Sequence, residues 1–322
     1  MKVAVTGSSG LIGTALTASL RADGHQVVRL VRRPPHAVSA DGTDAGAAGE
    51  IRWDPRAADA GDPALDGIDA CVHLAGAGVG DHRWTRAYKA EIRASRVLAT
   101  RALATALAAA KPAPTVFVAA SAIGWYGDTG GSEVTEDAPA GRGFLARVVH
   151  DWEAAAEPAR QAGIRVVHLR SGLILSAAGG VLARLAAPAR LGVLPRFGTG
   201  RQVMSWISLT DEIRAIRFLL DGVGAEGRSG PVNLTAPNAV TDSELTAALH
   251  AAFGKRDFRW LRVPEFALNL ALGEMSSELL NSARVLPRRL REAGFEFEYP
   301  TVEAALAAEL RYPGRESAAS VR

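Results

Sequence analysis

The sequence has little cysteine, lysine and tyrosine, and it has no long hydrophobic run. Cys71 is the only cysteine in 322 residues, so an internal disulfide is excluded, and no Cys/His cluster suggests a zinc site. The longer apolar stretches, such as Val116–Ala120, fall far short of the roughly 20 residues that cross a bilayer. The first residues run straight into a glycine loop and do not resemble a signal peptide. We therefore expect a cytoplasmic protein without a membrane partner.

The charge balance is close to neutral. The 37 Lys and Arg residues exceed the 34 Asp and Glu residues by three, and this excess is too small to predict nucleic-acid binding. Lysine occurs at only four positions, so arginine carries almost all of the positive charge. With 48% hydrophobic and 22% charged residues, the chain is expected to fold into roughly two globular domains.

Short apolar runs alternate with amphipathic helical patterns over the first two-thirds of the chain. The helix expected at Leu11–Asp23 places Ile12, Leu16 and Leu20 on one face, and Gly24 is suited to end it. Further helices are expected at Thr85–Ala110 and Leu145–Ala162, and strands at Lys2–Thr6, His25–Val31, Ile51–Trp53, Ala70–Leu74, Thr115–Ala120 and Arg165–Arg170. Largely apolar strands that alternate with helices predict an α/β fold with a doubly wound parallel sheet.

A glycine motif lies between the first expected strand and the first helix. Gly7, Gly10 and Gly13 follow the spacing G-x-x-G-x-x-G, with Leu11 and Ile12 at the start of the helix. Glycines allow the backbone to approach a pyrophosphate, and the free amides of a helix N-terminus attract its charge. Any tight turn can use glycine, but the order strand, loop, helix, strand favours a dinucleotide-binding site.

The residues after the second expected strand indicate which dinucleotide is bound. NAD-binding sites place an Asp or Glu there, about 20 residues after the glycines, to hold the ribose hydroxyl. This chain has Arg32 and Arg33, nineteen and twenty positions after Gly13. Loop arginines are often only solvated charges. However, guanidinium groups pair with a 2′-phosphate, which a carboxylate would repel. We therefore predict NADP(H) as the cofactor.

Two further motifs follow later strands. The segment Asp69-Ala-Cys-Val-His73-Leu74-Ala75-Gly76 ends in small residues, against which a cofactor can lie. We interpret His73 as a structural histidine inside the sheet. Together with the glycine loop and Ser121-Ala-Ile-Gly-Trp-Tyr126-Gly, this segment resembles the extended short-chain dehydrogenase/reductase superfamily.

Several segments resemble more narrowly the subfamily named "epimerase family". They are Arg52–Pro55, Trp84–Arg96, Ser205–Ile207 and Leu286–Leu290, and the match runs from residue 1 to about 310. The resemblance implies a Rossmann fold with an NADP(H) site and a small C-terminal helical module. Carried over position by position, it implies that the cofactor contacts Arg32, Arg33, Leu74, Ala75, Glu91, Arg96 and Leu173. Lys89, Arg93 and Arg96 also form one basic stripe on the expected helix.

The second half of the chain has a looser pattern. Helices are expected at Gly179–Leu191 and Asp211–Leu220, strands at Val203–Ile207 and Pro231–Leu234, and mainly helices after Thr241. We expect residues 1–235 to form the NADP-binding domain, with 172–205 contributing to the substrate cleft. Residues 236–312 would form a small helical domain, and 313–322 a flexible tail.

The catalytic motif of the superfamily is missing from this sequence. Its Tyr-x-x-x-Lys pair exchanges a proton with the substrate, but no tyrosine here is followed four residues later by a lysine. In the expected place, some two dozen residues after Ser121, the pair becomes Phe144/Val148 or Leu145/Val149, depending on the register. Neither pair can transfer a proton.

Two hydroxyl groups remain as candidate catalytic residues, those of Ser121 and Tyr126. The superfamily serine aligns equally well with Ala122, and a structural or binding role is favoured for Tyr126 over a catalytic one. The acidic residues nearby, Glu133 and Glu136 among them, are expected in a solvated loop.

These observations predict an NADP(H)-dependent oxidoreductase or epimerase-like enzyme that acts on an unknown small substrate. A phenol without a lysine neighbour keeps a pKa near ~10 and is a better acid than base at neutral pH, which favours reduction over epimerisation. The alternative is a catalytically silent NADPH-binding sensor or scaffold, and the absence of the Tyr-x-x-x-Lys pair favours this alternative. That gap disfavours an ordinary nucleotide-sugar epimerase. A homodimer is left open.

Overall fold

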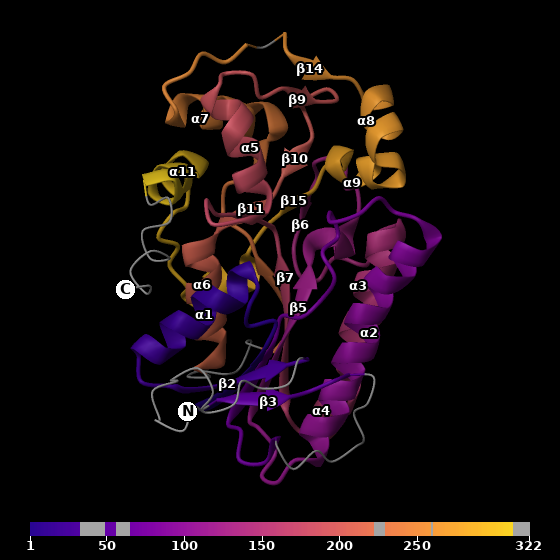
Figure 1. The fold of residues 1–322 in the computed structure, drawn as a ribbon, viewed down its shortest axis with the longest axis vertical. Helices are drawn as coiled ribbons and strands as arrows, with labels where there is room; N and C mark the ends of the chain where they lie inside the picture. The colour runs from indigo at the N-terminus through magenta and orange to yellow at the C-terminus, as the bar shows by residue number, and fades with distance from the viewer. Residues whose placement is uncertain (33–48, 56–64, 222–228, 259, 312–322) are drawn as a thin grey trace, which may run out of the picture.

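The centre of the molecule is a seven-stranded parallel sheet (Figure 1). The structure is a computed structural model and describes residues 1–32, 49–55, 65–221, 229–258 and 260–311. In chain order the strands are β1 (Lys2–Thr6), β2 (Gln26–Val31), β3 (Glu50–Arg52), β4 (Ala70–His73), β5 (Val116–Ala122), β7 (Arg165–Ser171) and β12 (Gly230–Leu234). Their order across the sheet is β12-β7-β5-β4-β1-β2-β3. From β1 the chain order runs to one side through β2 and β3, and from β4 it runs to the other side through β5, β7 and β12. The predicted doubly wound Rossmann sheet is therefore confirmed.

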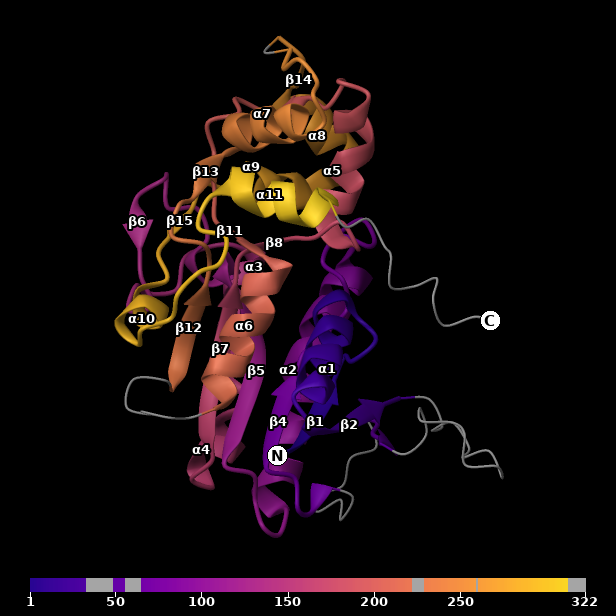
Figure 2. The ribbon, with the colours of Figure 1, turned by 90° about the vertical axis from the view of Figure 1, so that its left-hand side faces the viewer.

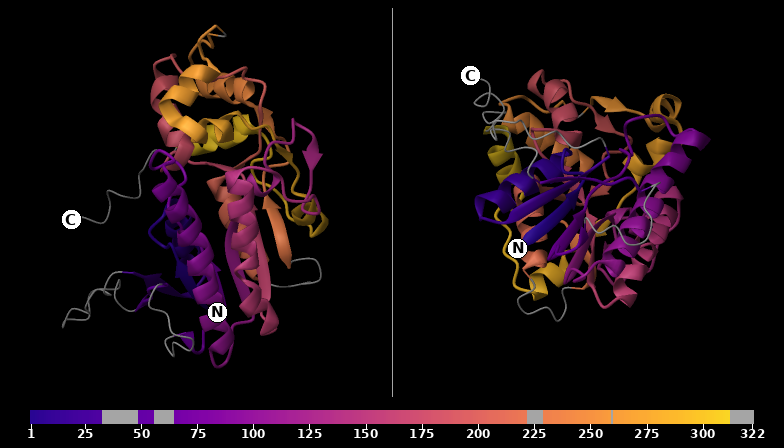
Figure 3. Two further views of the ribbon diagram at one scale, coloured as in Figure 1. Left: turned by 90° about the vertical axis from the view of Figure 1, so that its right-hand side faces the viewer. Right: turned by 60° about the horizontal axis from the view of Figure 1, so that its bottom comes forward.

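Helices cover both faces of the sheet. Helices α1 (Leu11–Ala22) and α6 (Leu209–Leu220) pack on one face, and α2 (Arg86–Ala109), α3 (Phe144–Ala154) and α4 (Glu157–Gln161) lie on the other. The alternation of side chains along a strand explains the two cores. Val3 and Val5 join the core beneath α1 and α6, whereas Ala4 joins the core beneath α2 and α4. Figure 3 shows the purple α2 and the magenta α3 side by side.

A second group of helices lies beyond the carboxyl ends of the strands (Figure 2). It contains α5 (Gly180–Arg190), α7 (Asp242–Ala252), α8 (Glu265–Leu272), α9 (Ser276–Leu280) and α11 (Val302–Arg311), while α10 (Arg288–Glu292) lies beside β12. Trp206 is fully buried in its core with Leu182, Leu249 and Leu306. Eight short strands pair two by two here: β6 (Glu133–Val134), β8 (Leu173–Leu175), β9 (Arg196–Phe197), β10 (Val203–Met204), β11 (Trp206–Ser208), β13 (Val240–Thr241), β14 (Arg262–Val263) and β15 (Arg284–Val285). The described chain after Thr241 is mainly helical, as predicted.

The single helix predicted at Leu145–Ala162 is wrong. Helix α3 ends at Ala154, and the separate α4 begins at Glu157. Pro158 lies in the first turn of α4 and has no N–H to donate to a carbonyl of the preceding turn. A helix can begin at this proline without losing a bond, but it cannot run through it unchanged.

The strand predicted at Val203–Ile207 is also divided. Ser205 separates β10 from β11, and its hydroxyl donates to the carbonyl of Ala283 and accepts from the amide of Val285. β10 pairs with β13 and β11 pairs with β8, so the two short strands belong to different sheets.

In the part of the chain that the structure describes, no helix is both long and apolar enough to span a membrane.

Candidate functional site

The glycine loop connects β1 to α1 and leaves the N-terminus of the helix open. Gly10 is the N-cap of α1, and among the described residues no side chain caps it. The amide of Gly10 donates to the carbonyl of Gly7 at 3.0 Å, and the amide of Thr14 donates to the carbonyl of Gly10 at 2.9 Å. Because the first turn of α1 also holds no acidic residue, its amides are available to an anion.

The three glycines are required for different reasons. Gly7 has a φ of +65°, and a Cβ there would lie 2.7 Å from the backbone of Leu74. A Cβ on Gly13 would lie 2.2 Å from the carbonyl oxygen of Gly7. Both glycines therefore serve the packing of the loop itself. Gly10 has ordinary backbone angles, and the nearest atom to its Cβ would be 3.3 Å away. Its missing side chain leaves room for a ligand.

These residues border a cavity of about 320 Å³ between β1, β4, the segment after β7 and the start of α5. Seven predicted cofactor residues line it: Gly7, Gly10, Leu11, Ile12, Gly13, Leu74 and Leu173. The remaining walls are Gly172, Ile174, Gly180 and Val181. The cavity is thus built from backbone and aliphatic side chains around an uncapped helix end, and the residues present fit a dinucleotide.

The predicted arginines after β2 are only partly described. Arg32 follows the end of β2 and is exposed. Arg33 lies outside the described residues. An exposed guanidinium at this position is able to meet a phosphate, and the part of Arg32 in cofactor choice stays a prediction.

Arg96 lies against the end of β4. A Cβ on Gly76 would be 3.5 Å from the guanidinium carbon of Arg96, which also lies 5.1 Å from the centre of the Trp152 ring. Ala75, beside Gly76, donates its amide to the hydroxyl of Thr6. Glu91 is half-buried on α2, more than one turn before Arg96. The roles of these predicted cofactor residues stay predictions.

Arg29 is a residue of this region that the sequence motifs do not single out. Its Nε donates to the hydroxyl of Ser8 in the glycine loop at 3.0 Å, and its guanidinium lies 3.2 Å from the fully buried carboxylate of Glu50. Arg29 therefore ties β2 to the glycine loop and to β3. The available signal was a charged residue inside the otherwise apolar run of β2.

The structure resolves which residues of α3 face the end of β5. A Cβ on Gly124, two residues after the end of β5, would lie 3.4 Å from Leu145 and 3.8 Å from Val149. Phe144 and Val148, the other register, pack with Trp84 and Ile92 near the start of α2, and Leu145 also borders that cluster. At the position where the resemblance places a proton-transferring pair, the strand end therefore meets two aliphatic side chains.

Ser121 belongs to a buried ion-pair cluster at the end of β5. Its hydroxyl donates to Glu153 at 2.6 Å, and Arg170 donates to the same carboxylate at 2.8 and 2.9 Å. Burial acts to raise the pKa of Glu153, but the hydrogen bonds of Arg170, the charge of His168 and that of Arg170 hold it below its ordinary value. Glu153 is thus an anion whose acceptors are already occupied.

Tyr126 joins the same cluster from the next turn of the chain. Its hydroxyl donates to the side-chain oxygen of Asn233 at 2.7 Å and accepts from Arg170 at 3.1 Å. The tyrosine is 3% exposed, and burial raises the pKa of its phenol while Arg170 and Asn233 oppose that rise. The guanidinium of Arg170 also lies 3.9 Å from the centre of the Trp125 ring. This geometry supports the structural role favoured for Tyr126, and catalysis by Ser121 or Tyr126 stays a prediction.

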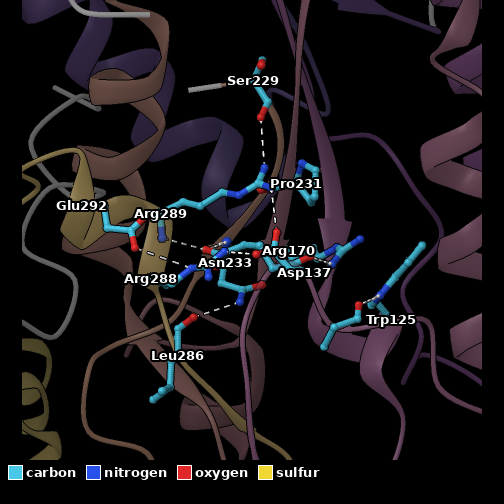
Figure 4. Close-up of polar contacts among 12 residues, drawn as sticks. Trp125, Asp137, Arg170, Ser229, Pro231, Asn233, Leu286, Arg288, Arg289 and Glu292 are labelled. Atoms are coloured by element: carbon cyan, nitrogen blue, oxygen red, sulfur yellow. Dashed lines mark hydrogen bonds and ion pairs between the residues drawn. The ribbon is translucent and has the colours of Figure 1, made fainter. Parts of the chain in front are cut away.

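The expectation of a solvated loop is wrong for Glu136. This side chain is 3% exposed and accepts from the backbone amides of Asn233 and Arg289. Arg289 in turn donates to the carbonyls of Ser229 and Pro231 (Figure 4). Glu136 and Arg289 together satisfy backbone groups of β12, the edge strand of the sheet.

His73 agrees with its interpretation as a structural histidine. It is fully buried at the end of β4, and its Nδ1 shares a 2.6 Å hydrogen bond with the hydroxyl of Thr6. Burial lowers the pKa of His73 to about 4, so the ring is neutral at physiological pH.

The basic stripe of α2 contacts other elements of the fold. Lys89 donates to Glu274 at 2.7 and 2.8 Å and lies 4.6 Å from the centre of the Phe144 ring, while Arg93 pairs with Asp151 of α3. Glu274 and Phe144 also line a second cavity, of about 560 Å³, between the start of α3 and α9.

With this geometry established, comparison with known proteins identifies the family. The model of the NAD dependent epimerase/dehydratase family matches residues 3–234, and a domain of unknown function, DUF1731, matches residues 263–309. The chain therefore belongs to the NAD dependent epimerase/dehydratase family, as its resemblance to the extended short-chain dehydrogenases implied.

Similar proteins cover almost the whole chain. The epimerase family protein MT2273 of Mycobacterium tuberculosis is 42% identical over 313 residues, which are 97% of this chain and 98% of that protein. The human epimerase family protein SDR39U1 is 32% identical over 310 residues, 95% and 98% of the two chains. A crystal structure of human SDR39U1 (isoform 2) with NADPH superposes with a TM-score of 0.85 and 31% identity, covering 97% of this chain and 99% of that one.

Proposed function

We propose that this chain binds NADP(H) in the cavity beside the glycine loop. On this basis it would be an NADP(H)-dependent oxidoreductase or epimerase-like enzyme of the extended short-chain type. The observation that carries the proposal is the uncapped N-terminus of α1, where the missing side chain of Gly10 leaves space beside free amides. The amides would hold the pyrophosphate, and Leu74 and Leu173 would flank the bound cofactor.

The preference for NADP(H) over NAD(H) is proposed from the charges around β2. No acidic residue follows Val31 directly, and exposed Arg32 stands in that place. The human relative that was solved with NADPH is consistent with this choice.

Reduction is the proposed direction of the reaction. NADPH supplies a hydride when it is bound, and a reduced carbonyl then needs a proton rather than a base. Leu145 and Val149, which lie near Gly124 after β5, have no group that could remove a proton from a substrate. The phenol of Tyr126, whose pKa is raised by burial, is a poor base. Epimerisation, which begins by removing a proton, therefore fits this chain less well.

Calorimetry with NADPH and NADH tests the cofactor assignment without a substrate. A charge-assisted bond to the 2′-phosphate should make NADPH bind more tightly by roughly 1–3 kcal/mol. The double variant Arg32→Glu/Arg33→Ala should lose this preference. The matched variant Arg147→Glu, at an exposed position of α3, should keep it. Equal affinities of the unmodified protein for the two cofactors would contradict the assignment.

The engaged hydroxyls favour a second candidate function, a catalytically silent NADPH-binding sensor or scaffold. Both candidate proton donors are committed to buried partners, Ser121 to Glu153 and Tyr126 to Asn233. A screen of a metabolite library for NADPH oxidation separates the two functions. Turnover of any member supports the enzyme, whereas tight NADPH binding with no oxidation across the library supports the silent protein.

A cytoplasmic location and a homodimer stay predictions.

A further inference from the structure

The segments around α5, α7, β14 and α8 form the end of the molecule that lies beyond the carboxyl ends of the sheet strands (Figures 1 and 2), and large apolar side chains are exposed on them. We call this end the apex and define it by the segments 190–193, 254–258, 260–263 and 265–270. Six of the ten large hydrophobic residues that are exposed in the described chain belong to it: Leu191, Val193, Phe258, Trp260, Phe266 and Leu270. Trp260 and Leu270 are each 78% exposed, and Phe266 is 74% exposed. Single exposed residues are common, but such a concentration marks a contact surface.

Backbone and side-chain contacts hold the segments of the apex together. The Phe258 and Trp260 rings lie 6.3 Å apart. A Cβ on Gly192 would lie 3.8 Å from Lys255, which places the segment after α5 beside the loop after α7. β14 pairs with β9 and is followed within two residues by α8, whose residues Phe266 and Leu270 lie one turn apart on one face.

The charges around these apolar residues are mostly positive. Arg190, Lys255, Arg256 and Arg262 are exposed within the apex. Of its acidic residues, Asp257 is already paired with the buried Arg196 at 2.5 Å. Glu265 is then the only described acidic residue of the apex outside that pair. The apex is consequently cationic on a molecule whose formal net charge is only +3.

We propose that the apex docks this protein reversibly onto an anionic lipid surface. Aromatic side chains enter the interface between headgroups and acyl chains, and flanking arginine and lysine side chains pair with anionic headgroups. The expectation of no membrane partner was based on the lack of a spanning segment. The apex is not a membrane-spanning segment, and it combines segments that lie far apart in the sequence.

The same observations weigh against other occupants. Two copies meeting through the apex would bring Lys255, Arg256 and Arg262 of one chain against the same cations of the other. A nucleic acid would use the cations and the aromatic rings, but it offers no partner for the aliphatic Leu191, Val193 and Leu270. A fluid lipid surface accepts both kinds of side chain.

Co-sedimentation of the full chain with sucrose-loaded vesicles tests the proposal. Vesicles of phosphatidylcholine with 30% phosphatidylserine should bind the protein, and vesicles of phosphatidylcholine alone should bind it at least tenfold more weakly. Lys255→Gln/Arg256→Gln should weaken binding to the anionic vesicles by roughly 25-fold, because each cation near such a surface contributes about fivefold. Trp260→Ser/Phe266→Ser should weaken it by at least tenfold.

Matched variants at exposed positions on other elements control for loss of hydrophobicity or charge alone. Leu98→Ser on α2 and Arg147→Gln on α3 should bind vesicles as the unmodified protein does. Thermal unfolding should be unchanged in all four variants because every altered side chain is exposed. The proposal is overturned by equal binding to neutral and anionic vesicles, or by vesicle binding that the apex variants retain. It is also overturned if the apex variants abolish self-association or RNA binding while the anionic vesicles bind nothing.

Discussion

Two regions at the carboxyl edge of the sheet differ in whether their polar groups have hydrogen-bond partners within the protein. At β1, the glycine loop and the first turn of α1 present backbone amides that no side chain caps within the described structure. At β5 and β7, Ser121, Glu153 and Arg170 bond to one another in a buried cluster that Tyr126 and Asn233 complete. The first region has donors without acceptors, and the second has its donors and acceptors matched.

This difference bears separately on the binding of a cofactor and on the transfer of a proton. An uncapped helix end beside a cavity is prepared for an anion that arrives from outside. A satisfied buried cluster holds its protons, because moving one would leave a buried charge unpaired. The region that binds a cofactor and the region that would transfer a proton therefore place separate demands on the sequence.

The largest expected effect concerns the open region. Gly10→Val should raise the Kd for NADPH by at least about 100-fold, because the γ-methyl groups would occupy the space beside the first-turn amides. The free energy of unfolding should fall by less than about 1 kcal/mol, since Gly10 has angles that valine adopts. Calorimetry and urea unfolding measure the two quantities. Normal NADPH binding by this variant would show that the loop is only a turn.

Gly13→Ala is the matched opposite within the same loop. Its Cβ would meet the carbonyl oxygen of Gly7 at 2.2 Å, so this variant should lose stability, and any loss of binding should follow from the distorted loop. If Gly13→Ala and Gly10→Val behave alike, the division between a packing glycine and a binding glycine fails.

The closed region should respond most strongly in stability. Arg170→Met leaves the carboxylate of Glu153 buried without its cation, and we expect the free energy of unfolding to fall by roughly 3–5 kcal/mol. Arg160→Met removes the exposed pair with Glu157 and should cost no more than about 1 kcal/mol. Urea denaturation of both variants gives the comparison. Losses of equal size would mean that burial does not increase the cost, in free energy of unfolding, of removing the arginine.

Glu212, which bonds to the end of β7, should make stability depend on pH. It is fully buried at the start of α6 and accepts from Ser171 at the end of β7 at 2.7 Å. Burial raises the pKa of Glu212 to about 8, so between roughly pH 5 and 8 the folded chain keeps a proton that the unfolded chain has released. The contribution of Glu212 should therefore lower the free energy of unfolding as the pH rises through this window.

Glu212→Gln should remove this dependence and stabilise the protein at pH 8.5 by roughly 2–4 kcal/mol. Denaturation curves of the variant and the unmodified protein at pH 5.5, 7 and 8.5 measure the effect. The exposed Glu157→Gln serves as the control and should leave the pH dependence unchanged. Parallel pH profiles of Glu212→Gln and the unmodified protein would contradict the prediction.

Within the closed region, Tyr126→Phe should affect stability less than Arg170→Met does, and it tests the role of the phenol directly. Losing the hydroxyl leaves the oxygen of Asn233 without its donor, so the free energy of unfolding should fall by roughly 1–2 kcal/mol, with NADPH affinity unchanged. Once a substrate is known, a fall in turnover of roughly 100-fold or more would identify the phenol as the proton donor. Unchanged turnover would leave Tyr126 with a structural role alone.

The sheet could be predicted from the sequence because its signals are local. Strands such as Lys2–Thr6 and Val116–Ala122 are largely apolar runs, and the glycine loop combines turn geometry and ligand space within seven residues. Five residues that line the cavity, Gly7, Gly10, Leu11, Ile12 and Gly13, followed from the glycine motif, and the resemblance added Leu74 and Leu173. Each of these depends on neighbours in the chain or on a familiar spacing. The sequence did not indicate Gly172, Ile174, Gly180 and Val181.

The closed region could not be predicted, because its partners are far apart in the sequence. Glu136 reads as a surface acid until Asn233 and Arg289 are brought to it by the fold, about 100 and 150 residues later. The pairing of Ser121 and Arg170 with Glu153 likewise depends on where α3 lies against the sheet. The charged Arg29 inside β2 gave a signal, but only the nearby Ser8 and Glu50 explain it.

The side chains that finish the edge of β12 bear on how the protein is made. Arg289 supplies donors to Ser229 and Pro231, and β15 completes β6 through Arg284 and Val285. A ribosome releases these residues after every strand of the main sheet has emerged. Until then the last strand has an unprotected edge, and Glu136 is without one of its partners. A chain that stops before Arg284 lacks the donors of Arg289 to Ser229 and Pro231, and an edge strand with such unpaired carbonyls is open to pairing with another molecule.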